Sequence, residues 1–266
     1  MTESQDIQPQ NSFKILLIGD SCIDEYIYGT CDRLNPEAPV PVLKVTRNES
    51  KLGMAANVKL NLESFGCDVD LMTGGIKSIK RRYIDERSKQ HIVRVDDDKN
   101  SAPFNPCLES LHYYQYDAIV ISDYNKGYVT YENVAEVRSL FSGPIFMDTK
   151  KPDLAKFNGI YVKVNESEYN NRTSINDSLI VTLGENGAMY KQDDIEIQYE
   201  SPQVDVVDVC GAGDTFLSAL AYYFLKKRDI LQAIEFANKC AAITVTHRGV
   251  YSLTLDDIEN IDSEWT

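Results

Sequence analysis

The sequence predicts an α/β fold with a mainly parallel central sheet flanked by helices, and with a small β-flap inserted into it. Two observations predict the body: short, nearly continuous apolar runs recur along the chain, and helical patterns lie between several of them. Such runs are typical of parallel strands that are covered on both faces. A third observation predicts the flap: four segments mix polar and apolar side chains.

The strands and helices of the body alternate, which is typical of a layered α/β fold. Helices are expected at 53–66, which ends at Gly66, and at 131–141. A further helix begins near Asp214 and closes with basic residues at 226–228, the charge order that a helix dipole favours. The expected strands of the central sheet are 13–20, 69–73, 116–122, 144–148, 160–164 and 178–183.

The flap is expected to consist of strands at 24–30, 40–46, 80–86 and 91–96. One face of each strand could be solvated or could cover a ligand. An isolated flap has unpaired edges and a half-apolar face, and pairing with a second copy removes both liabilities. We therefore expect a homodimer through these strands. Residues 1–12 are expected to be disordered, and 13–266 to form one domain.

Charge and cysteine usage narrow the class of protein. A net charge of −14 and a pI near 4.7 argue against nucleic acid or an anionic membrane as a partner, although a small anionic substrate fits if basic groups gather locally. The six cysteines are scattered without a metal-ligand spacing, which indicates reduced thiols in a cytoplasm. No secretion signal and no apolar run of the roughly 18 residues needed to span a bilayer is visible.

The stretch "CGAGDT" combines a glycine turn, a carboxylate and a helix start. Gly211 and Gly213 allow a tight loop whose backbone N–H groups approach a ligand, and the first helical turn adds unpaired N–H groups. Together they predict an anion site suited to a phosphate. Asp214 beside it could accept a proton from an attacking hydroxyl. The alternative is a helix N-cap that follows an ordinary turn.

Motifs along most of the chain resemble the ribokinase (PfkB) family of sugar kinases. They include "AANVKLNLESFG", "MDTKK", "VNESE", "VTLGENGA" and "DVCGAGDT", in that family's order over residues 14 to about 258. "NPEAPVPV" and "SDYNKG" resemble the branch that phosphorylates heptose 7-phosphate at O1. The resemblance implies a ribokinase-like fold with the flap as its lid, ATP and Mg²⁺ as cofactors, and a sugar phosphate as substrate.

The resemblance also implies roles for matching residues. Asp214 corresponds to the catalytic base, and Gly211, Ala212 and Gly213 to the anion hole. Asn165 and Glu168 match an element that organises Mg²⁺, in keeping with the preference of Mg²⁺ for oxygen ligands reached through water. Without the family context, "NESE" would be a polar turn.

On the acceptor side, Asp24 and Asn57 align with residues that hold sugar hydroxyls, or they are a solvated strand end and a helix-face amide. Arg33, Arg94 and Lys126 are candidates for the substrate phosphate, or they are ordinary surface charges.

On the nucleotide side, Thr182, Gly184 and Gly187 match an element that passes under the ribose and phosphates, and Asn238 falls where the family lines its adenine pocket. A β-turn and an amphipathic helix would explain the same residues. Lys150 is a candidate for the γ-phosphate, or it is a loop lysine.

The chain departs from the family in three places. Met54 replaces a glycine of the substrate loop, and the segments after 72–75 and after 168 are shortened. An active, abbreviated kinase is favoured, and nucleotidyl transfer is expected from another protein. A kinase for another sugar or nucleoside, or a catalytically silent sugar- or nucleotide-binding protein, are the alternatives.

Overall fold

A central sheet of eight strands forms the body of the protein. The computed structural model describes residues 12–75, 78–108 and 111–263, so the expected disordered start lies, up to residue 11, outside the described residues. The strand order is β12-β11-β10-β9-β8-β7-β1-β4. These strands are β1 (Lys14–Gly19), β4 (Asp68–Thr73), β7 (Ala118–Asp123), β8 (Ile145–Thr149), β9 (Tyr161–Asn165), β10 (Leu179–Thr182), β11 (Ala188–Gln192) and β12 (Ile195–Tyr199).

All six strands expected for this sheet are confirmed, and their neighbours pair in parallel from β4 to β10. The sequence interpretation missed β11 and β12, which pair antiparallel at one edge. Their side chains alternate between covered and exposed, so neither strand forms a continuous apolar run.

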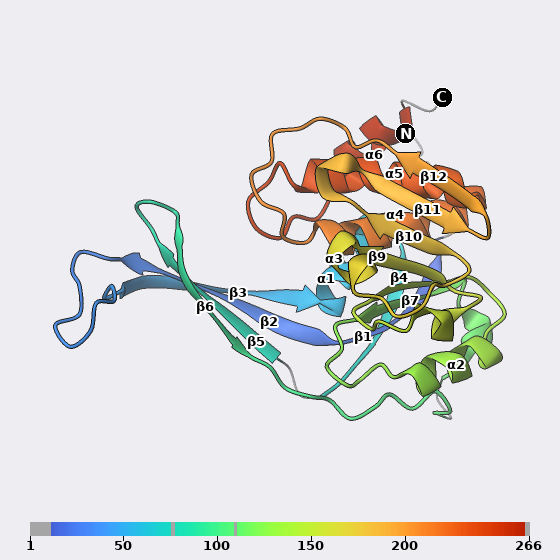
Figure 1. The fold of residues 1–266 in the computed structure, drawn as a ribbon, viewed down its shortest axis with the longest axis horizontal. Helices are drawn as coiled ribbons and strands as arrows, with labels where there is room; N and C mark the ends of the chain where they lie inside the picture. Colours follow the sequence, from blue (N-terminus) through green and yellow to red (C-terminus); the bar gives the residue numbers. More distant parts are fainter. Residues whose placement is uncertain (1–11, 76–77, 109–110, 264–266) are drawn as a thin grey trace, which may run out of the picture.

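Helices cover both faces of the sheet (Figure 1). Alternate residues of β1 point to opposite faces, with Ile15 in one core and Leu16 in the other. The first core is completed by helices α1 (Ala55–Ser64), α4 (Ala212–Lys227), α5 (Ile230–Thr244) and α6 (Leu255–Ser263). The second contains α2 (Tyr131–Leu140) and the short helices η1 (Tyr113–Gln115) and η2 (Leu154–Phe157). Two further short helices, α3 (Glu166–Asn170) and η3 (Gly184–Asn186), follow strands β9 and β10.

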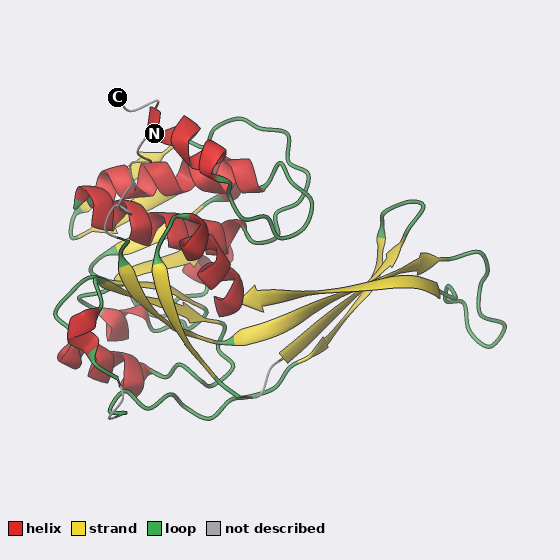
Figure 2. Cartoon of the chain, turned by 180° about the vertical axis from the view of Figure 1, so that it is seen from behind, coloured by secondary structure: helices red, strands yellow, loops and turns green. Residues whose placement is uncertain are grey.

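A separate four-stranded sheet, the lid, projects from the body (Figures 1 and 2). Its order is β3-β2-β5-β6, with β2 (Ser21–Thr30), β3 (Lys44–Met54), β5 (Ser78–Asp85) and β6 (His91–Asp97). The expected strands near 24–30, 80–86 and 91–96 are confirmed. The strand expected at 40–46 instead runs over 44–54, because most of β3 is exposed on both faces and its polar residues hide the strand pattern. The helix expected from 53 consequently begins at Ala55.

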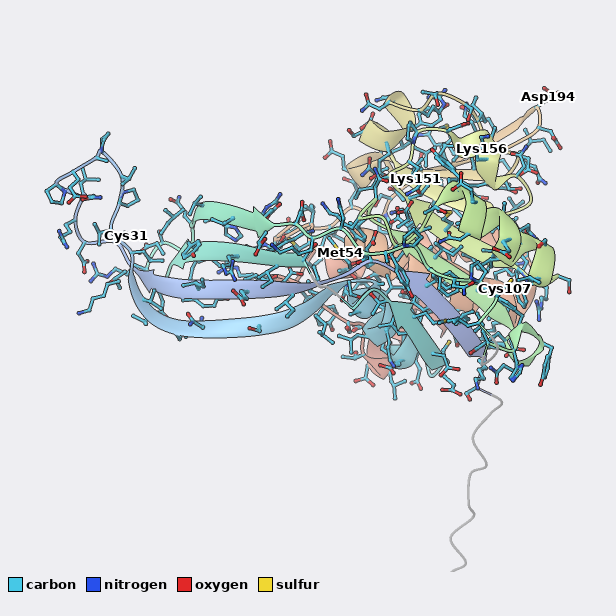
Figure 3. All side chains as sticks on the ribbon, turned by 90° about the horizontal axis from the view of Figure 1, so that it is seen from below. Cys31, Met54, Cys107, Lys151, Lys156 and Asp194 are labelled. Carbon is cyan, nitrogen blue, oxygen red and sulfur yellow. The ribbon has the colours of Figure 1, made fainter. Side chains whose placement is uncertain are left out.

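The lid joins the body with almost no connecting chain at two places. Only Asp20 separates β1 from β2, and β3 runs directly into α1. At the second join Met54 has φ 57° and ψ −131°, a backbone conformation that residues other than glycine rarely adopt. Figure 3 shows Met54 where the lid meets the body and Cys31 at the lid's far end.

No helix in the described part of the chain is long and apolar enough to cross a membrane.

Candidate active site

The start of helix α4 lies at the carboxyl ends of the parallel strands. Gly211 is the N-cap, with φ 84°, and the helix begins at Ala212, two residues earlier than expected. The backbone N–H groups of 212–214 therefore lie in the first turn, where a helix offers them no acceptor, and that of Ala212 makes a long 3.4 Å hydrogen bond to the carbonyl oxygen of Val209 in the preceding loop. Asp214 is not the N-cap, so the capping alternative for its side chain is wrong.

The Asp214 carboxylate is buried and held by two side chains from other elements. Asn57 Nδ2 of α1 donates to Oδ2 at 2.7 Å, and the Tyr124 hydroxyl donates to Oδ1 at 2.9 Å. Burial raises the pKa of Asp214 to about 6, against the opposing effect of these two hydrogen bonds. The carboxylate thus has a pKa near the range in which a general base works best.

Tyr124 is positioned by the turn after β7. Asp20 Oδ2 accepts the backbone N–H groups of Tyr124 and Lys126, at 2.9 and 3.1 Å. Burial raises the pKa of Tyr124 well above its ordinary value, and the neighbouring Asp214 adds to this effect. The phenol therefore stays protonated and can only donate to the carboxylate.

A cavity of about 150 Å³ opens in front of Asp214, between the lid and the body. From the lid it takes Asp24, Lys80 and Arg82, and the Arg82 guanidinium forms an ion pair with Asp24. Met54 also lines it, where the resemblance to the ribokinase family implies a glycine. We call this space the inner cavity. It combines carboxylate, amide and basic groups, which suits a polyhydroxyl ligand.

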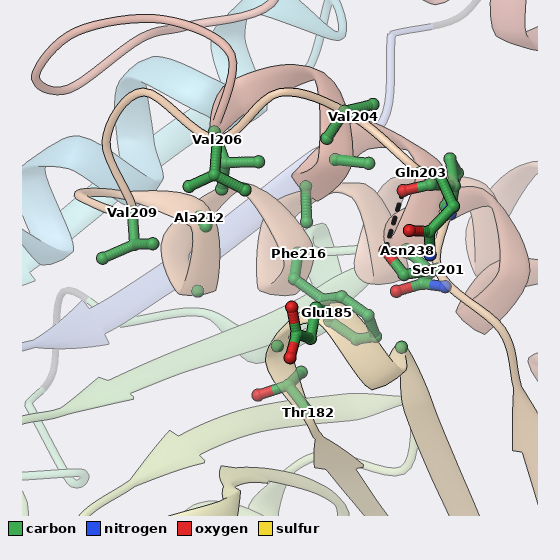
Figure 4. Close-up of a pocket in the computed structure, with 17 residues that line it drawn as sticks. Thr182, Glu185, Ser201, Gln203, Val204, Val206, Val209, Ala212, Phe216 and Asn238 are labelled. Carbon is green, nitrogen blue, oxygen red and sulfur yellow. Dashed lines mark hydrogen bonds between the residues drawn. The ribbon is translucent and has the colours of Figure 1, made fainter.

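A second cavity of about 230 Å³ lies on the other side of the α4 start, and Figure 4 shows its lining. Much of its wall is apolar, and Val204, Val206 and Val209 are exposed on the loop that borders it. Thr182, Gly184, Gly187 and Asn238 also line it. Apolar walls with a few polar groups suit a flat heteroaromatic base.

The segment 211–213 separates the two cavities. Gly211 lines the inner cavity, whereas Ala212 and Gly213 line the second one. A Cβ on Gly213 would lie 3.0 Å from Lys163 Nζ, which forms a 2.7 Å ion pair with Asp148. A phosphate that passed between ligands in the two cavities would therefore cross the helix N-terminus close to a buried lysine.

Asn165 and Glu168 form a capping box at α3. Asn165 Oδ1 accepts the N–H of Glu168, Glu168 Oε2 accepts the N–H of Asn165, and both distances are 2.8 Å. Glu168 Oε1 also accepts Lys150 Nζ at 2.6 Å, and although burial alone would lower the pKa of Lys150, this contact raises it. No group of three or more His, Cys, Asp or Glu side chains that could hold a metal gathers in the described ranges. The oxygen donors present fit a Mg²⁺ ion held mainly by nucleotide phosphates and water.

The structure brings most of the expected site residues together around the two cavities. These are Asp24, Asn57, Gly211 and Asp214 at the inner cavity, and Thr182, Gly184, Gly187, Ala212, Gly213 and Asn238 at the second. Two of them have local structural reasons for their identity. A Cβ on Gly187 would lie 1.9 Å from the carbonyl oxygen of Tyr199, and Asn238 Nδ2 donates to the carbonyl oxygen of Glu200 at 2.8 Å.

The three expected phosphate-binding residues do not line the inner cavity. Arg33 is exposed in the loop after β2, at the far end of the lid. Arg94 pairs with Asp96 on the exposed face of β6, and Lys126 pairs with Asp98 at 2.5 Å. The basic residues at the cavity are instead Lys80 and Arg82.

Sequence reasoning also missed Tyr124 and Lys163 as site residues. Tyr124 lies within the quoted "SDYNKG", and Lys163 directly precedes the "VNESE" motif. Lys163 could have been recognised because it is a lysine within an apolar strand that is buried, and a buried charge requires a partner.

Comparison with known proteins places these observations in a family. Residues 163–257 match the pfkB family carbohydrate kinases. The chain is 32% identical to the Bifunctional protein HldE of a Nitratiruptor species and 30% identical to that of Aliarcobacter butzleri. These matches cover 94% of the chain but only 65% and 64% of the two relatives, so the chain spans about two thirds of their length.

Solved structures share the fold at lower identity. A ribokinase from Thermotoga maritima superposes with a TM-score of 0.70 at 17% identity, covering 94% of this chain and 99% of that one. Phosphofructokinase-2 from Escherichia coli, in complex with potassium, gives 0.69 at 16% identity, covering 95% and 99%. The fold is therefore ribokinase-like, as expected, and residues 163–257 belong to the pfkB family of carbohydrate kinases.

Proposed function

We propose that the protein is an ATP-dependent kinase that transfers the γ-phosphate to a hydroxyl of a sugar. One observation carries the proposal: the buried carboxylate of Asp214 lies in the first turn of α4, and this turn separates the inner cavity from the second cavity. A base, an anion site and two ligand spaces thus meet at one point, which is the arrangement that in-line phosphoryl transfer requires.

The chain's own residues would act as follows. Asp214 accepts the proton of the attacking sugar hydroxyl, while Asn57 and Tyr124 hold its carboxylate in place. The N–H groups of 212–214 take up negative charge on the transferred phosphate, and Lys163 lies behind them. Mg²⁺, when bound, would neutralise charge on the nucleotide phosphates. Asn165 and Glu168 would orient its waters, and Lys150 would stand close to them.

ATP is the nucleotide we propose for the second cavity. The exposed valines of the bordering loop offer an apolar surface that a purine would cover. Thr182, Gly184 and Gly187 would lie along the ribose and phosphates, and Asn238 would lie beside the base.

The acceptor we propose is D-glycero-D-manno-heptose 7-phosphate, giving the 1,7-bisphosphate. Support comes from "NPEAPVPV" and "SDYNKG", which resemble the heptose branch of the family, and from relatives named HldE. Met54 in the wall of the inner cavity favours a second candidate, a kinase for a different sugar or nucleoside, because its side chain occupies space that a glycine would leave open.

The test is a screen of ATP consumption with phosphorylated and free sugars, and with nucleosides. Turnover with heptose 7-phosphate above all other acceptors supports the first candidate. Turnover confined to another acceptor supports the second. Binding of ATP without turnover on any acceptor would overturn the kinase proposal in favour of a silent binding protein.

We also propose the domain organisation, the assembly and the cellular location of the protein. Residues 13–266 form one kinase domain with its lid, and two copies pair through the lid edges β3 and β6, which carry exposed Val45, Leu52, Val93 and Val95. A cytoplasmic location is supported by the six cysteines, none of which forms a disulfide in the part of the chain that the structure describes.

A further inference from the structure

A third cavity, of about 330 Å³, lies in the same cleft between lid and body, and we call it the outer cavity. The lid contributes aromatic and apolar side chains and three basic ones to its wall. The body contributes two short stretches, 207–208 and 248–249. The proposed function gives this space no role.

Strand register places the outer cavity in line with the inner one. On β2, Asp24, Tyr26 and Tyr28 are two residues apart and so point to the same face of the lid. On β5 their partners are Lys80, Arg82 and Ile84. Asp24 and the two basic residues line the inner cavity, whereas the tyrosines and Ile84 line the outer one.

The body side shows the same order. Cys210, Gly211 and Val250 line the inner cavity, while 207–208 and 248–249, close by in the chain, line the outer one. The two cavities are therefore consecutive parts of one cleft. Asp24 and Tyr28 are four strand residues apart, a separation of about 13 Å at about 3.3 Å per residue.

The two cavities differ in charge. In the inner cavity the cations Lys80 and Arg82 face two carboxylates, Asp24 and Asp214. Basic groups outnumber acidic ones in the outer cavity. Among the described residues that line it, Asp208 is the one carboxylate, and the basic residues are Lys51, Lys89, His91 and Arg248.

Among the residues that the structure describes, three of the basic residues of the outer cavity have no carboxylate within ion-pair distance. In the described part of the chain, Lys51, Lys89 and Arg248 form no ion pair. Asp208 uses its two oxygens to accept the backbone N–H groups of Cys210 and Gly249, at 3.0 and 2.9 Å. In a chain of net charge −14, this local excess of cations requires a reason.

We propose that the outer cavity binds a phosphate monoester, the terminal phosphate that the acceptor sugar already carries, and thereby selects phosphorylated acceptors. The proposal rests on the proposed function and deepens it. The hydroxyl to be phosphorylated lies at Asp214 in the inner cavity, and the sugar extends along the lid past Tyr26. Its existing phosphate then meets Lys51, Lys89 and Arg248, which supply the charge-assisted hydrogen bonds that a dianion needs.

The test compares heptose 7-phosphate with the free heptose as acceptors of the full-length protein. Arg248→Met and Lys51→Met remove one positive charge each but keep an unbranched side chain. Lys156→Met is the matched control, because Lys156 is exposed on the body in η2 (Figure 3). Each cavity variant should lower the ratio of kcat/KM for the phosphorylated acceptor to that for the free sugar by roughly 10- to 100-fold, mainly through KM. The control should leave the ratio unchanged. An unchanged ratio in both cavity variants would overturn the proposal.

Inorganic phosphate distinguishes the acceptor's own phosphate from a separate anion ligand. If the proposal holds, inorganic phosphate competes with heptose 7-phosphate in the wild type and competes more weakly in Arg248→Met. Inhibition or activation by phosphate that is not competitive with the acceptor would show an independent anion site and would overturn the assignment.

A binding measurement without ATP separates this proposal from the proposed function. Calorimetric titration of the wild type with heptose 7-phosphate should give tighter binding than titration with the free heptose, and Arg248→Met should abolish most of the difference. If the wild type shows this preference but transfers no phosphate, the kinase proposal fails and the anion site stands. If it transfers phosphate but shows no preference, the anion site fails alone.

Discussion

The hydroxyl of Tyr124 donates a 2.9 Å hydrogen bond to Oδ1 of Asp214, across 90 residues of sequence. Asn57 donates to the other oxygen of the same carboxylate, so side chains from two other elements fix this acid group. Both donors stabilise its charged form, while burial favours the protonated form. The balance leaves a carboxylate that can be ionised at neutral pH and still accept a proton.

We expect Asp214→Asn to abolish most of the activity without loss of stability. The amide cannot take the hydroxyl proton, so kcat should fall by roughly 10²- to 10⁴-fold. Because burial raises the pKa of Asp214 above the unfolded value, the stability that this group contributes is present at low pH and is lost as the pH rises through about 6. A neutral amide avoids that loss, so Tm near pH 7 should stay equal or rise. Turnover and Tm should be measured on one preparation, with exposed Asp194→Asn as the control. Wild-type turnover together with a lower Tm would contradict the assignment.

We expect the pH profile of kcat/KM to rise through about pH 6 and then level off, since the free enzyme needs Asp214 ionised. Tyr124→Phe removes a hydrogen bond that favours the ionised form, and should therefore move this acidic limb to higher pH. The comparison requires full profiles of both proteins at saturating ATP and Mg²⁺. A limb at the same pH in both proteins would show that Asp214 does not govern it.

We expect Glu168→Gln to raise the Mg²⁺ concentration needed for half-maximal activity, with little change in sugar binding. Glutamine can keep the capping box of α3, so the substitution removes charge and leaves the helix start in place. The control is Glu166→Gln, because Glu166 is exposed in the same first turn. Equal Mg²⁺ dependence of the two variants, or full activity in excess chelator, would reduce Glu168 to a capping role.

We expect the protein to be a homodimer held by lid edges. The double substitution Val45→Lys and Val93→Lys places charges on both edge strands and should give a monomer that remains folded. Light scattering at micromolar concentration measures the assembly, and Leu140→Lys on the body is the control. A wild-type monomer under these conditions would rule the dimer out.

The body of the fold was predictable because buried parallel strands leave long apolar runs. The elements missed or misplaced are those without such runs. The last two strands of the sheet, β11 and β12, alternate, and β3 is exposed over nine of its eleven residues. In these elements pairing with neighbouring strands contributes more than a continuous buried run does, and pairing leaves no local sequence pattern.

The site residues that belong to sequence motifs were predictable from the sequence. The basic residues of the inner cavity were not. In "KRRY" any of three consecutive basic residues could face the cavity, and the strand register determines which of them do. Lys80 and Arg82 face the inner cavity, while Arg81 lies between them and pairs with Glu25 at 2.8 Å. Register depends on β2 and on where the lid meets the body, so the sequence of this segment alone could not choose the residues that face the cavity.

The two short joins between lid and body mark the axis about which the lid would rotate. Met54 lines the inner cavity and Asp20 directly precedes β2, whereas Tyr28 and Lys89 line the outer cavity further out along the lid. When a rigid arm turns, displacement grows with distance from the axis. A small rotation of the lid would therefore leave Asp24 almost in place beside Asp214 while it widened or narrowed the outer cavity. Such a rotation would admit or release the phosphate end of a ligand, while the reacting end stays in place.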